Sequence, residues 1–502
     1  MAYLLGIDIG TSGTKALICD GRGKVLATAS APHTRQEPKP GFSEQSPTQW
    51  WSAVQKATKA AVKKAKIRGA QVTGVGLSGQ MHGSVFLGSN KSGEGTDPLR
   101  PAILWNDQRT GAQCDEITKA AGGKRKLISM VGNPALTGFT APKILWVRQH
   151  EKTVWKETKH VLLPKDYIRL RMTGDYATEV SDASGLLLLD VKKRQYNQKL
   201  LDLLKLKREL FPDCVESHEV TGTLHAAGAK ALGLKAGTPV VGGAGDNAAG
   251  AVGNGIVSRG LVNASLGTSG VVYAHADEPV YDPQGRVHTM CSAIEGKWCV
   301  FGCMLSAAGS FQWYRDQLRS GEDFSELVKE AKKAAPGSDG LYFLPYLTGE
   351  RCPHPDPDAR GAFIGLTTRH GKKEMTRALL EGITCGMAEQ TRIFTEMGLP
   401  MKTIRLTGGG AQSAFWRQLQ ADVYGKPVAT VNSAEGPAYG VAILAGVGTG
   451  VWKSVPAACK QVVKETATLK PDPVAKKAYA KRVDTYQSLY PALKDVFPQM
   501  DC

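Results

Sequence analysis

The sequence predicts a two-lobed α/β protein, because one strand–turn–strand pattern occurs twice along the chain. Residues 3–19 consist of an apolar run, a Gly-Thr-Ser-Gly turn at 10–13 and a second apolar run. Residues 261–274 repeat this order around the same turn at 267–270. Self-similarity at this range indicates a duplicated fold, and a chain of 502 residues is too long for a single hydrophobic core. We therefore expect two lobes joined by a hinge near 242–256, with ligands bound in the cleft between them.

The first lobe is expected to begin with a β-hairpin, to which a third strand over 25–29 is added. Ser46 is the expected N-cap of a helix that starts at Pro47, and Gln49 stands at the position that completes a capping box. The apolar residues of this helix fall on one face: Trp50, Val54, Ala57, Ala61 and Ala65. A strand of the buried type over 72–77 follows and leads into the motif Gln-Met-His.

The composition is that of an ordinary globular protein, with 42% hydrophobic and 22% charged residues. The net charge is +17, but the lysines recur on helix-like stretches such as 56–66 and 453–482, without an arginine-rich tail. We therefore predict no nucleic-acid partner. No run approaches the roughly 18 apolar residues that a membrane helix needs, and the N-terminus lacks the positive region of a signal peptide. These observations predict a soluble, cytoplasmic protein with no membrane partner.

The first Gly-Thr-Ser-Gly turn carries groups suited to a nucleotide phosphate. Its glycines let the backbone approach a phosphate closely, and the hydroxyls of Thr11, Ser12 and Thr14 add hydrogen-bond donors. Asp8 comes just before the turn, where a carboxylate could hold Mg²⁺ or its waters. A plain hairpin with good turn residues is the alternative, and the second copy of the turn favours the phosphate interpretation.

The glycine-rich segment 242–254 contains a Gly-x-Gly-x-x-Ala pattern that starts at Gly243, a loose form of the dinucleotide-binding fingerprint. That fingerprint requires an acidic residue about 20 positions later for the ribose. Residues 247–276 contain no Asp or Glu, so a dehydrogenase is excluded. The remaining carboxylate, Asp246, lies among small residues that leave room for a substrate, as a general base requires. A helix N-cap is the alternative role for Asp246, because the residues after it favour a helix.

A third glycine-rich turn, Leu-Thr-Gly-Gly-Gly-Ala at 406–411, joins a strand-like stretch to a helix-like stretch from Ser413. Three glycines at this place allow a flat adenosine to lie against the backbone, although such turns are common and only some of them bind nucleotides. The P-loop and the protein-kinase signatures are both absent from the sequence. A protein of this sequence that uses ATP does so with another architecture.

At these motifs the chain resembles the FGGY family of sugar kinases, within the larger actin-like ATPase fold, over nearly its whole length. The stretches that carry the resemblance are GIDIGTSGTK at 6–15, SEQSPTQWW at 43–51, GQMHG at 79–83, RPAILWNDQR at 100–109, GFTAPKILWVR at 138–148, LLPKDYIRLRMTGDYA at 162–177, GDNAAGAVG at 245–253, SLGTSG at 265–270, FLPYLTGERCPH at 343–354 and GGGAQSAFWRQ at 408–418. The resemblance implies an α/β fold of two RNase-H-like lobes, of the actin and hexokinase type, around a central cleft.

The resemblance also implies three units. Residues 1–244 are the expected N-terminal FGGY-type lobe, with the sugar side and the first phosphate turn. Residues 245–450 are the expected C-terminal FGGY-type lobe, with the nucleotide side. Residues 451–502 are the expected helical C-terminal extension, packed on the second lobe.

By this resemblance the catalytic base is Asp246, and Asn247 belongs to the substrate-binding set together with Met81 and His82. In members that act on D-xylulose the pair at 81–82 lies against the sugar, whereas members that act on glycerol carry an Arg-Glu pair there. A buried structural role is the alternative for His82. The predicted nucleotide-binding residues are Thr11, Ser12, Thr14, Gly267, Thr268, Gly309, Gly409, Gly410 and Ala411, and the predicted metal-binding residue is Asp8. Trp105, Asn106, Asp107 and Arg109 are expected near the sugar pocket.

The sequence therefore predicts a carbohydrate kinase that uses ATP and Mg²⁺ to phosphorylate D-xylulose. One rival is a kinase of the same family for another ketose or polyol, such as ribulose, fuculose, erythritol or glycerol. A rival from another class is a non-kinase ATPase or sugar sensor with the actin-like fold. A homodimer, which is common among such kinases, is the oligomeric state that the resemblance allows.

Overall fold

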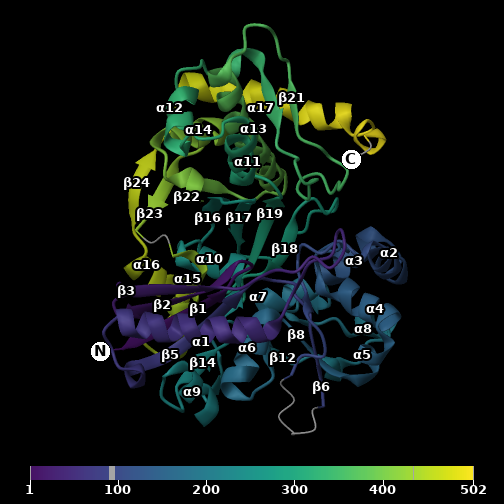
Figure 1. Ribbon diagram of the computed structural model, residues 1–502, viewed down its shortest axis with the longest axis vertical. Helices are drawn as coiled ribbons and strands as arrows, with labels where there is room; N and C mark the ends of the chain where they lie inside the picture. The colour runs from purple at the N-terminus through teal and green to yellow at the C-terminus, as the bar shows by residue number, and fades with distance from the viewer. Residues whose placement is uncertain (1, 90–96, 433–434, 501–502) are drawn as a thin grey trace.

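The computed structural model describes residues 2–89, 97–432 and 435–500, and within them it contains two seven-stranded sheets. The first sheet has the order β13 (Val220–Thr223), β14 (Pro239–Val241), β5 (Val72–Gly79), β1 (Tyr3–Ile9), β2 (Gly13–Asp20) and β3 (Val25–Pro32), with β15 (Ala244–Gly245) paired to β5. The second has the order β18 (His288–Cys291), β19 (Trp298–Met304), β17 (Gly270–Ala276), β16 (Gly260–Leu266), β22 (Met401–Gly408), β23 (Val428–Val431) and β24 (Glu465–Leu469). In Figure 1 the first sheet lies in the lower half of the view and the second in the upper half.

The two sheets repeat one pairing scheme. β1 is antiparallel to β2 and parallel to β5, and β16 is in the same way antiparallel to β17 and parallel to β22. Each hairpin is closed by a tight turn: the Gly10 N–H donates to the carbonyl oxygen of Gly13 (3.0 Å), and the Gly267 N–H donates to that of Ser269 (3.1 Å). The predicted α/β class and its duplicated hairpins are therefore confirmed.

One long helix covers the corresponding face of each sheet. α1 (Pro47–Lys64) packs on β2 and β3, and α13 (Lys372–Glu396) packs on β17 and β19. The predicted inner face of α1 is buried, except that Ala65 is half-buried at the C-cap. The predicted capping box is wrong, because the Ser46 side chain makes no bond to the helix backbone and Gln49 Oε1 accepts instead from the Thr34 hydroxyl (3.1 Å).

Two helices fill the space between the sheets (Figure 1). α10 (Asp246–Gly253) packs against α15 (Gly436–Gly448), and α15 packs in turn on β1 and β5. A Cβ atom at Gly440 would overlap the carbonyl oxygen of Ala249, and one at Gly6 would overlap that of Ala438. Glycine is required at these positions because the backbones themselves are in contact. The start of α10 is therefore held at a set distance from the end of β1.

Residues after 450 complete the second sheet and one of its faces. α16 (Val455–Val462) packs on α15, β24 adds to the edge of the sheet beside β23, and α17 (Pro473–Leu493) packs on α13 and α14 (Ala414–Tyr424). The Tyr479 hydroxyl of α17 donates to the buried Glu381 Oε1 of α13 (2.6 Å). Among the residues described, no helix is both long and apolar enough to span a bilayer.

We predict that Gly440→Ala destabilises the protein by about 2 kcal/mol or more, because the added methyl group must push α15 away from α10. The matched control is Gly111→Ala at the start of α2 (Gly111–Ala120), where a Cβ atom would meet nothing within 4 Å. Thermal unfolding should show a lower midpoint temperature for Gly440→Ala than for wild type, and an unchanged midpoint temperature for Gly111→Ala. Equal midpoints would mean that the two helices are not in the contact described.

Candidate active site

Asp246 is the first residue of α10 and directly follows β15, which pairs with the end of β5. Its Oδ1 accepts hydrogen bonds from the backbone N–H (2.7 Å) and the side-chain Nδ2 (3.0 Å) of Asn247. The N-cap position belongs to Gly245, so Asp246 does not have the capping role. Burial raises the pKa of Asp246 to about 7, and repulsion from Asp8 adds to the increase. A carboxylate with a pKa near neutrality is suited to accept a proton from a hydroxyl group.

Asp8 lies near the end of β1, opposite Lys15 in β2 and Ser78 in β5. Burial raises the pKa of Asp8 to about 6. Its Oδ1 is buried and has no hydrogen-bond partner among the described residues. A buried oxygen of this kind requires a partner from outside the chain, such as water or a cation.

Asp246 lies within electrostatic reach of both glycine turns. On the side of the first turn its negative charge interacts with that of Asp8. On the side of the second turn the Cys303 thiol lies beside Ser269; burial raises the pKa of this thiol, and the charge of Asp246 adds to the increase. Asp246 therefore interacts electrostatically with residues beside both glycine turns.

Two polar side chains form hydrogen bonds that support the first glycine turn. Gln45 Nε2 donates to the carbonyl oxygen of Thr11 (2.6 Å), and Trp105 Nε1 donates to the Thr11 hydroxyl (3.0 Å). Ser12 is exposed at the tip of the turn, whereas Thr14 is fully buried in β2. Of the three predicted hydroxyls, only that of Ser12 is both exposed and free of a side-chain contact among the described residues.

The second turn rests on the start of α11 (Ala308–Leu318). The carbonyl oxygen of Thr268 accepts from the N–H groups of Ala307 (2.8 Å) and Gly309 (3.1 Å), and that of Gly267 accepts from Ala308 (2.9 Å). A Cβ atom at Gly309 would lie 2.9 Å from the carbonyl oxygen of Thr268. The structure thus brings three of the predicted nucleotide residues, Gly267, Thr268 and Gly309, into direct contact.

A largely apolar cavity of about 460 Å³ lies beside the third glycine turn. It is lined by Ala308, Phe311, Phe324, Ser325, Val328, Lys329, Gly409, Gln412, Ser413 and Trp416. The predicted Gly409 forms part of its wall, and Gly410 and Ala411 continue the same short 3₁₀ turn. A slot with aromatic walls and a glycine edge suits a planar ring system such as adenine.

The sugar-side residues adjoin the base. Met81 is buried, and its Sδ lies 3.9 Å from Asn247 Nδ2. His82 is half-buried, and its Nδ1 lies 3.0 Å from the carbonyl oxygen of Gly185. Burial lowers the pKa of His82 well below its usual range, so the ring is neutral. The structure therefore brings Met81 into contact with Asn247, the chain neighbour of Asp246, while His82 contacts Gly185.

Only part of the 105–109 stretch is available to a ligand. Arg351, from the second half of the chain, lies over the Trp105 indole at 5.4 Å and forms no ion pair with any residue described. Asp107 and Arg109 are buried and paired with each other (2.7 Å), and Arg109 also pairs with Glu44 (2.8 Å). The charges of Asp107 and Arg109 are neutralised by these ion pairs, and both groups act electrostatically on Lys143, whose Nζ bonds to the His82 carbonyl oxygen.

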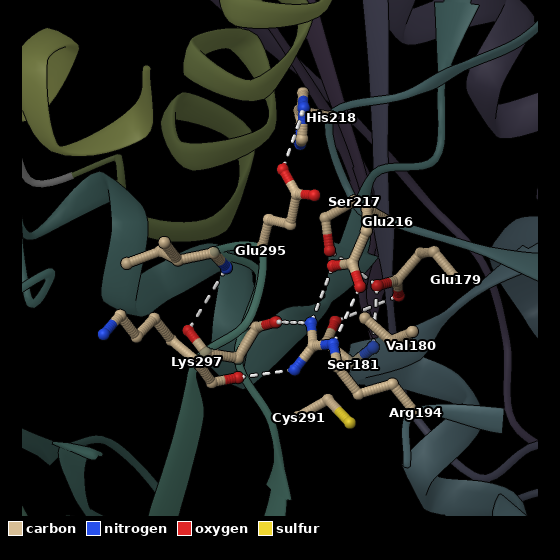
Figure 2. Close-up of polar contacts among 12 residues, drawn as sticks. Glu179, Val180, Ser181, Arg194, Glu216, Ser217, His218, Cys291, Glu295 and Lys297 are labelled. Atoms are coloured by element: carbon tan, nitrogen blue, oxygen red, sulfur yellow. Dashed lines mark hydrogen bonds and ion pairs between the residues drawn. The ribbon is translucent and has the colours of Figure 1, made fainter. Parts of the chain in front are cut away.

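A buried network supports the backbone that carries Asp246. The Ser181 hydroxyl accepts from the Gly245 N–H (3.2 Å) and donates to Glu179 Oε1 (3.0 Å), while the Ser217 hydroxyl donates to Glu179 Oε2 (2.7 Å). Figure 2 shows Glu179 between these two serines. The peptide before Asp246 is thereby anchored to a fully buried carboxylate.

Arg194 connects this network to the second half of the chain. Its guanidinium binds both carboxylate oxygens of Glu216 (2.7 and 2.6 Å) and donates to the carbonyl oxygen of Lys297 (2.7 Å) (Figure 2). Glu216 is next to Ser217 in the chain, and Lys297 directly precedes β19. The second sheet is therefore attached to the same cluster that anchors the base.

Comparison with known proteins identifies the family of the chain. Residues 3–253 match the N-terminal domain of the FGGY family of carbohydrate kinases, and residues 262–449 match the C-terminal domain of that family. The chain belongs to the FGGY family of carbohydrate kinases.

Individual relatives of this FGGY kinase are similar over their full lengths. The xylulose kinase of Escherichia coli K12 is 40% identical over 490 residues, which cover 97% of this chain and 99% of the relative. A xyloylose kinase structure from Brucella ovis has a TM-score of 0.90 at 35% identity and covers 98% of this chain and 100% of that one. A gluconate kinase structure from Lactobacillus acidophilus has a TM-score of 0.93 at 27% identity, with 99% of both chains covered.

Membership of a kinase family makes ATP a substrate of this chain. Sequence reasoning found the glycine edge of the apolar cavity but missed the aromatic walls: Phe311, Phe324 and Trp416. Trp416 lies in the GGGAQSAFWRQ stretch and follows the helix cap Ser413, so this motif could have identified it as a residue of the cavity wall. Phe311 and Phe324 come from α11 and α12 (Phe324–Ala331), where no local pattern points to a ligand.

We predict that kcat/KM of this FGGY kinase for its sugar falls as the pH drops through about 7, the pKa of Asp246 in the ligand-free protein. The sign follows because only the ionised carboxylate accepts a proton, and kcat/KM reports the free enzyme. Rates measured between about pH 5 and about pH 9 at constant ionic strength check this, with ATP binding measured at each pH as the control. A profile that stays flat down to the acid end would contradict the role of Asp246 as the base.

Proposed function

We propose that this FGGY kinase transfers the terminal phosphoryl group of ATP to the terminal hydroxyl of D-xylulose and forms D-xylulose 5-phosphate. The observation that supports the proposal is the 3.9 Å contact of Met81 Sδ with Nδ2 of Asn247, the chain neighbour of Asp246. The Met81–His82 pair is the one expected in members that act on D-xylulose. The similarity to the xylulose kinase of E. coli K12 supports the same substrate.

In the proposed reaction Asp246 accepts the proton of the attacking hydroxyl. The new bond forms between that oxygen and the terminal phosphorus, while the bond from this phosphorus to the bridging oxygen of ADP breaks. Such a transfer depends mainly on positioning and on stabilisation of charge. Water must be kept out of the cleft during the step, since a free water molecule would compete with the sugar for the phosphoryl group.

The proposed nucleotide contacts come from three places in the fold. Backbone N–H groups and hydroxyls of the two hairpin turns hold the phosphates, and the third glycine turn with its apolar cavity holds the adenosine. The residues assigned are Thr11, Ser12, Thr14, Gly267, Thr268, Gly309, Gly409, Gly410 and Ala411. Thr14 is buried in β2, so in this assignment its contribution is confined to the backbone of the turn.

We also propose that Asp8 holds Mg²⁺, directly or through its waters. The buried and unpaired Oδ1 of Asp8 fits an oxygen-preferring cation, which typically takes one or two carboxylates together with substrate phosphates. Such a cation would neutralise charge on the phosphates.

Three further expectations remain predictions from the sequence. They are the domain boundaries at 244/245 and 450/451, a homodimer and a cytoplasmic location.

A second candidate substrate is an aldonate such as D-gluconate. The observation in its favour is Arg351, a cation over Trp105 that forms no ion pair in the described part of the chain. A guanidinium of this kind could bind a carboxylate, and one similar structure is a gluconate kinase.

Coupled ATP-consumption assays with D-xylulose, D-ribulose, glycerol and D-gluconate decide between the candidate substrates. We expect the highest kcat/KM for D-xylulose. A higher kcat/KM for another substrate would overturn the proposal, and so would a rate of ATP consumption that is the same with and without sugar.

We predict that Asp246→Asn lowers kcat by about 10²- to 10⁴-fold, the range that general-base catalysis contributes. Binding of ATP should be unchanged, because Asn is isosteric with Asp and the phosphate turns are untouched. Asp115→Asn on the exposed surface of α2 is the matched control and should behave as wild type. Single-turnover rates and ATP titrations separate the two effects, and near-normal turnover in the first variant would remove Asp246 from the base position.

A further inference from the structure

His82 has a backbone conformation that few residues other than glycine adopt. Its φ is 69°, in the left-handed region. A side chain in this region persists only where the surrounding structure holds it there, and such residues are concentrated at ligand sites. Whatever holds the His82 peptide also determines where its imidazole stands next to Met81 and Asp246.

Two side chains from the first turn of α4 (Thr140–His150) hold the carbonyl oxygen of His82. Lys143 Nζ donates to this oxygen at 2.9 Å, and the Thr140 hydroxyl lies 3.0 Å from it. Lys143 Nζ also donates to the carbonyl oxygen of Gly138 (2.6 Å), so one ammonium group joins the His82 peptide to the turn before α4. Two donors on one carbonyl oxygen, one of them cationic, restrain the peptide plane strongly.

The imidazole is oriented by the same group of residues. A carbonyl oxygen only accepts hydrogen bonds, so the contact of His82 Nδ1 with the Gly185 oxygen places the ring proton on Nδ1. The Thr140 hydroxyl is 3.3 Å from that same oxygen, and the Phe139 ring packs edge-on against the imidazole at 5.0 Å. The ring is neutral, so Nε2 carries a lone pair and can accept a hydrogen bond from a hydroxyl group.

Lys143 is an unusual residue for a purely structural contact. It is fully buried, and it forms no ion pair within the ranges that the structure describes. Burial lowers the pKa of Lys143 to about 7, against the attraction of Asp107, which raises it. An apolar side chain could attach α4 to the core without this penalty. The placement of an ammonium on the His82 carbonyl therefore indicates a role in the site.

We propose that Thr140 and Lys143 are positioning residues for His82, whose carbonyl they hold so that Nε2 accepts a hydrogen bond from a sugar hydroxyl. The inference rests on the proposed function, which places the sugar against Met81 and His82. It assigns no ligand contact to Thr140 or Lys143, because both side chains are fully buried.

The first test compares two substitutions at one position. Thr140→Val keeps the shape of the side chain and removes the hydroxyl, whereas Thr140→Ser keeps the hydroxyl. We expect Thr140→Val to raise KM for D-xylulose by about tenfold while KM for ATP stays the same, and Thr140→Ser to restore most of the loss. Equal increases in both variants, or an equal increase for sugar and ATP, would overturn the proposal.

A double-mutant cycle with His82→Ala tests whether the effect passes through the imidazole. Once the ring is absent, Thr140→Val should have no further effect on KM for the sugar. Additive effects would mean that Thr140 acts on the site by another route. Gly185→Ala is a useful companion, because its Cβ atom would lie 2.7 Å from His82 Nδ1 and displace the ring while leaving both donors in place.

A third measurement needs no substrate and therefore separates this proposal from the choice of sugar. Nitrogen NMR of protein labelled in its histidines, with the His82 signal assigned from a His82→Gln variant, reports the tautomer and environment of the ring. Wild type and Thr140→Ser should show a neutral ring protonated on Nδ1, and Thr140→Val and Lys143→Met should change that signal. If the signal is the same in all variants, the positioning role is wrong. If it responds as expected while the sugar panel favours another substrate, the positioning role holds and the proposed substrate fails.

Discussion

Between the two sheets, α10 and α15 approach so closely that the backbone of Gly440 lies against the carbonyl oxygen of Ala249. α15 is in similar contact with β1 at Gly6, so the first sheet and both helices form one continuous packing unit. The distance between Asp8 at the end of β1 and Asp246 at the start of α10 follows from this backbone contact. No direct bond between the two carboxylates is needed to bring them into one cleft, and the glycines that permit the approach are as important to the site as the acids.

Desolvation then sets the chemistry of the cleft. Burial raises the pKa of Asp8 to about 6 and that of Asp246 to about 7, and the negative charge of Asp8 makes Asp246 still harder to ionise. On the sugar side the same physical effect acts on a cation, since burial lowers the pKa of Lys143 to about 7. Groups held this far from their ordinary titration range reduce stability, and they are retained where binding or proton transfer uses them.

Separate supports hold the two sides of the proposed sugar position. The base side is anchored through Ser181 and Glu179, beside a cluster in which Arg194 reaches the second sheet at Lys297. The sugar side is anchored through Lys143 on α4 in the first half of the chain. Both supports also contact the second half of the chain, since the Phe139 ring beside His82 packs edge-on against His288 at 5.5 Å.

The sequence by itself determined the features that are local or periodic. The two Gly-Thr-Ser-Gly hairpins, the buried face of α1 and the isolated Asp246 among small residues could all be read from spacing, because turns, helix faces and room around a side chain are properties of neighbouring residues. The tertiary structure decided the rest. Gln49 bonds to Thr34 and not to its helix cap, Thr14 faces the interior of β2, and the cavity walls come from helices far apart in the chain. The support of His82 by Lys143 depends on a left-handed peptide and on contacts across 61 positions of sequence, which no local pattern encodes.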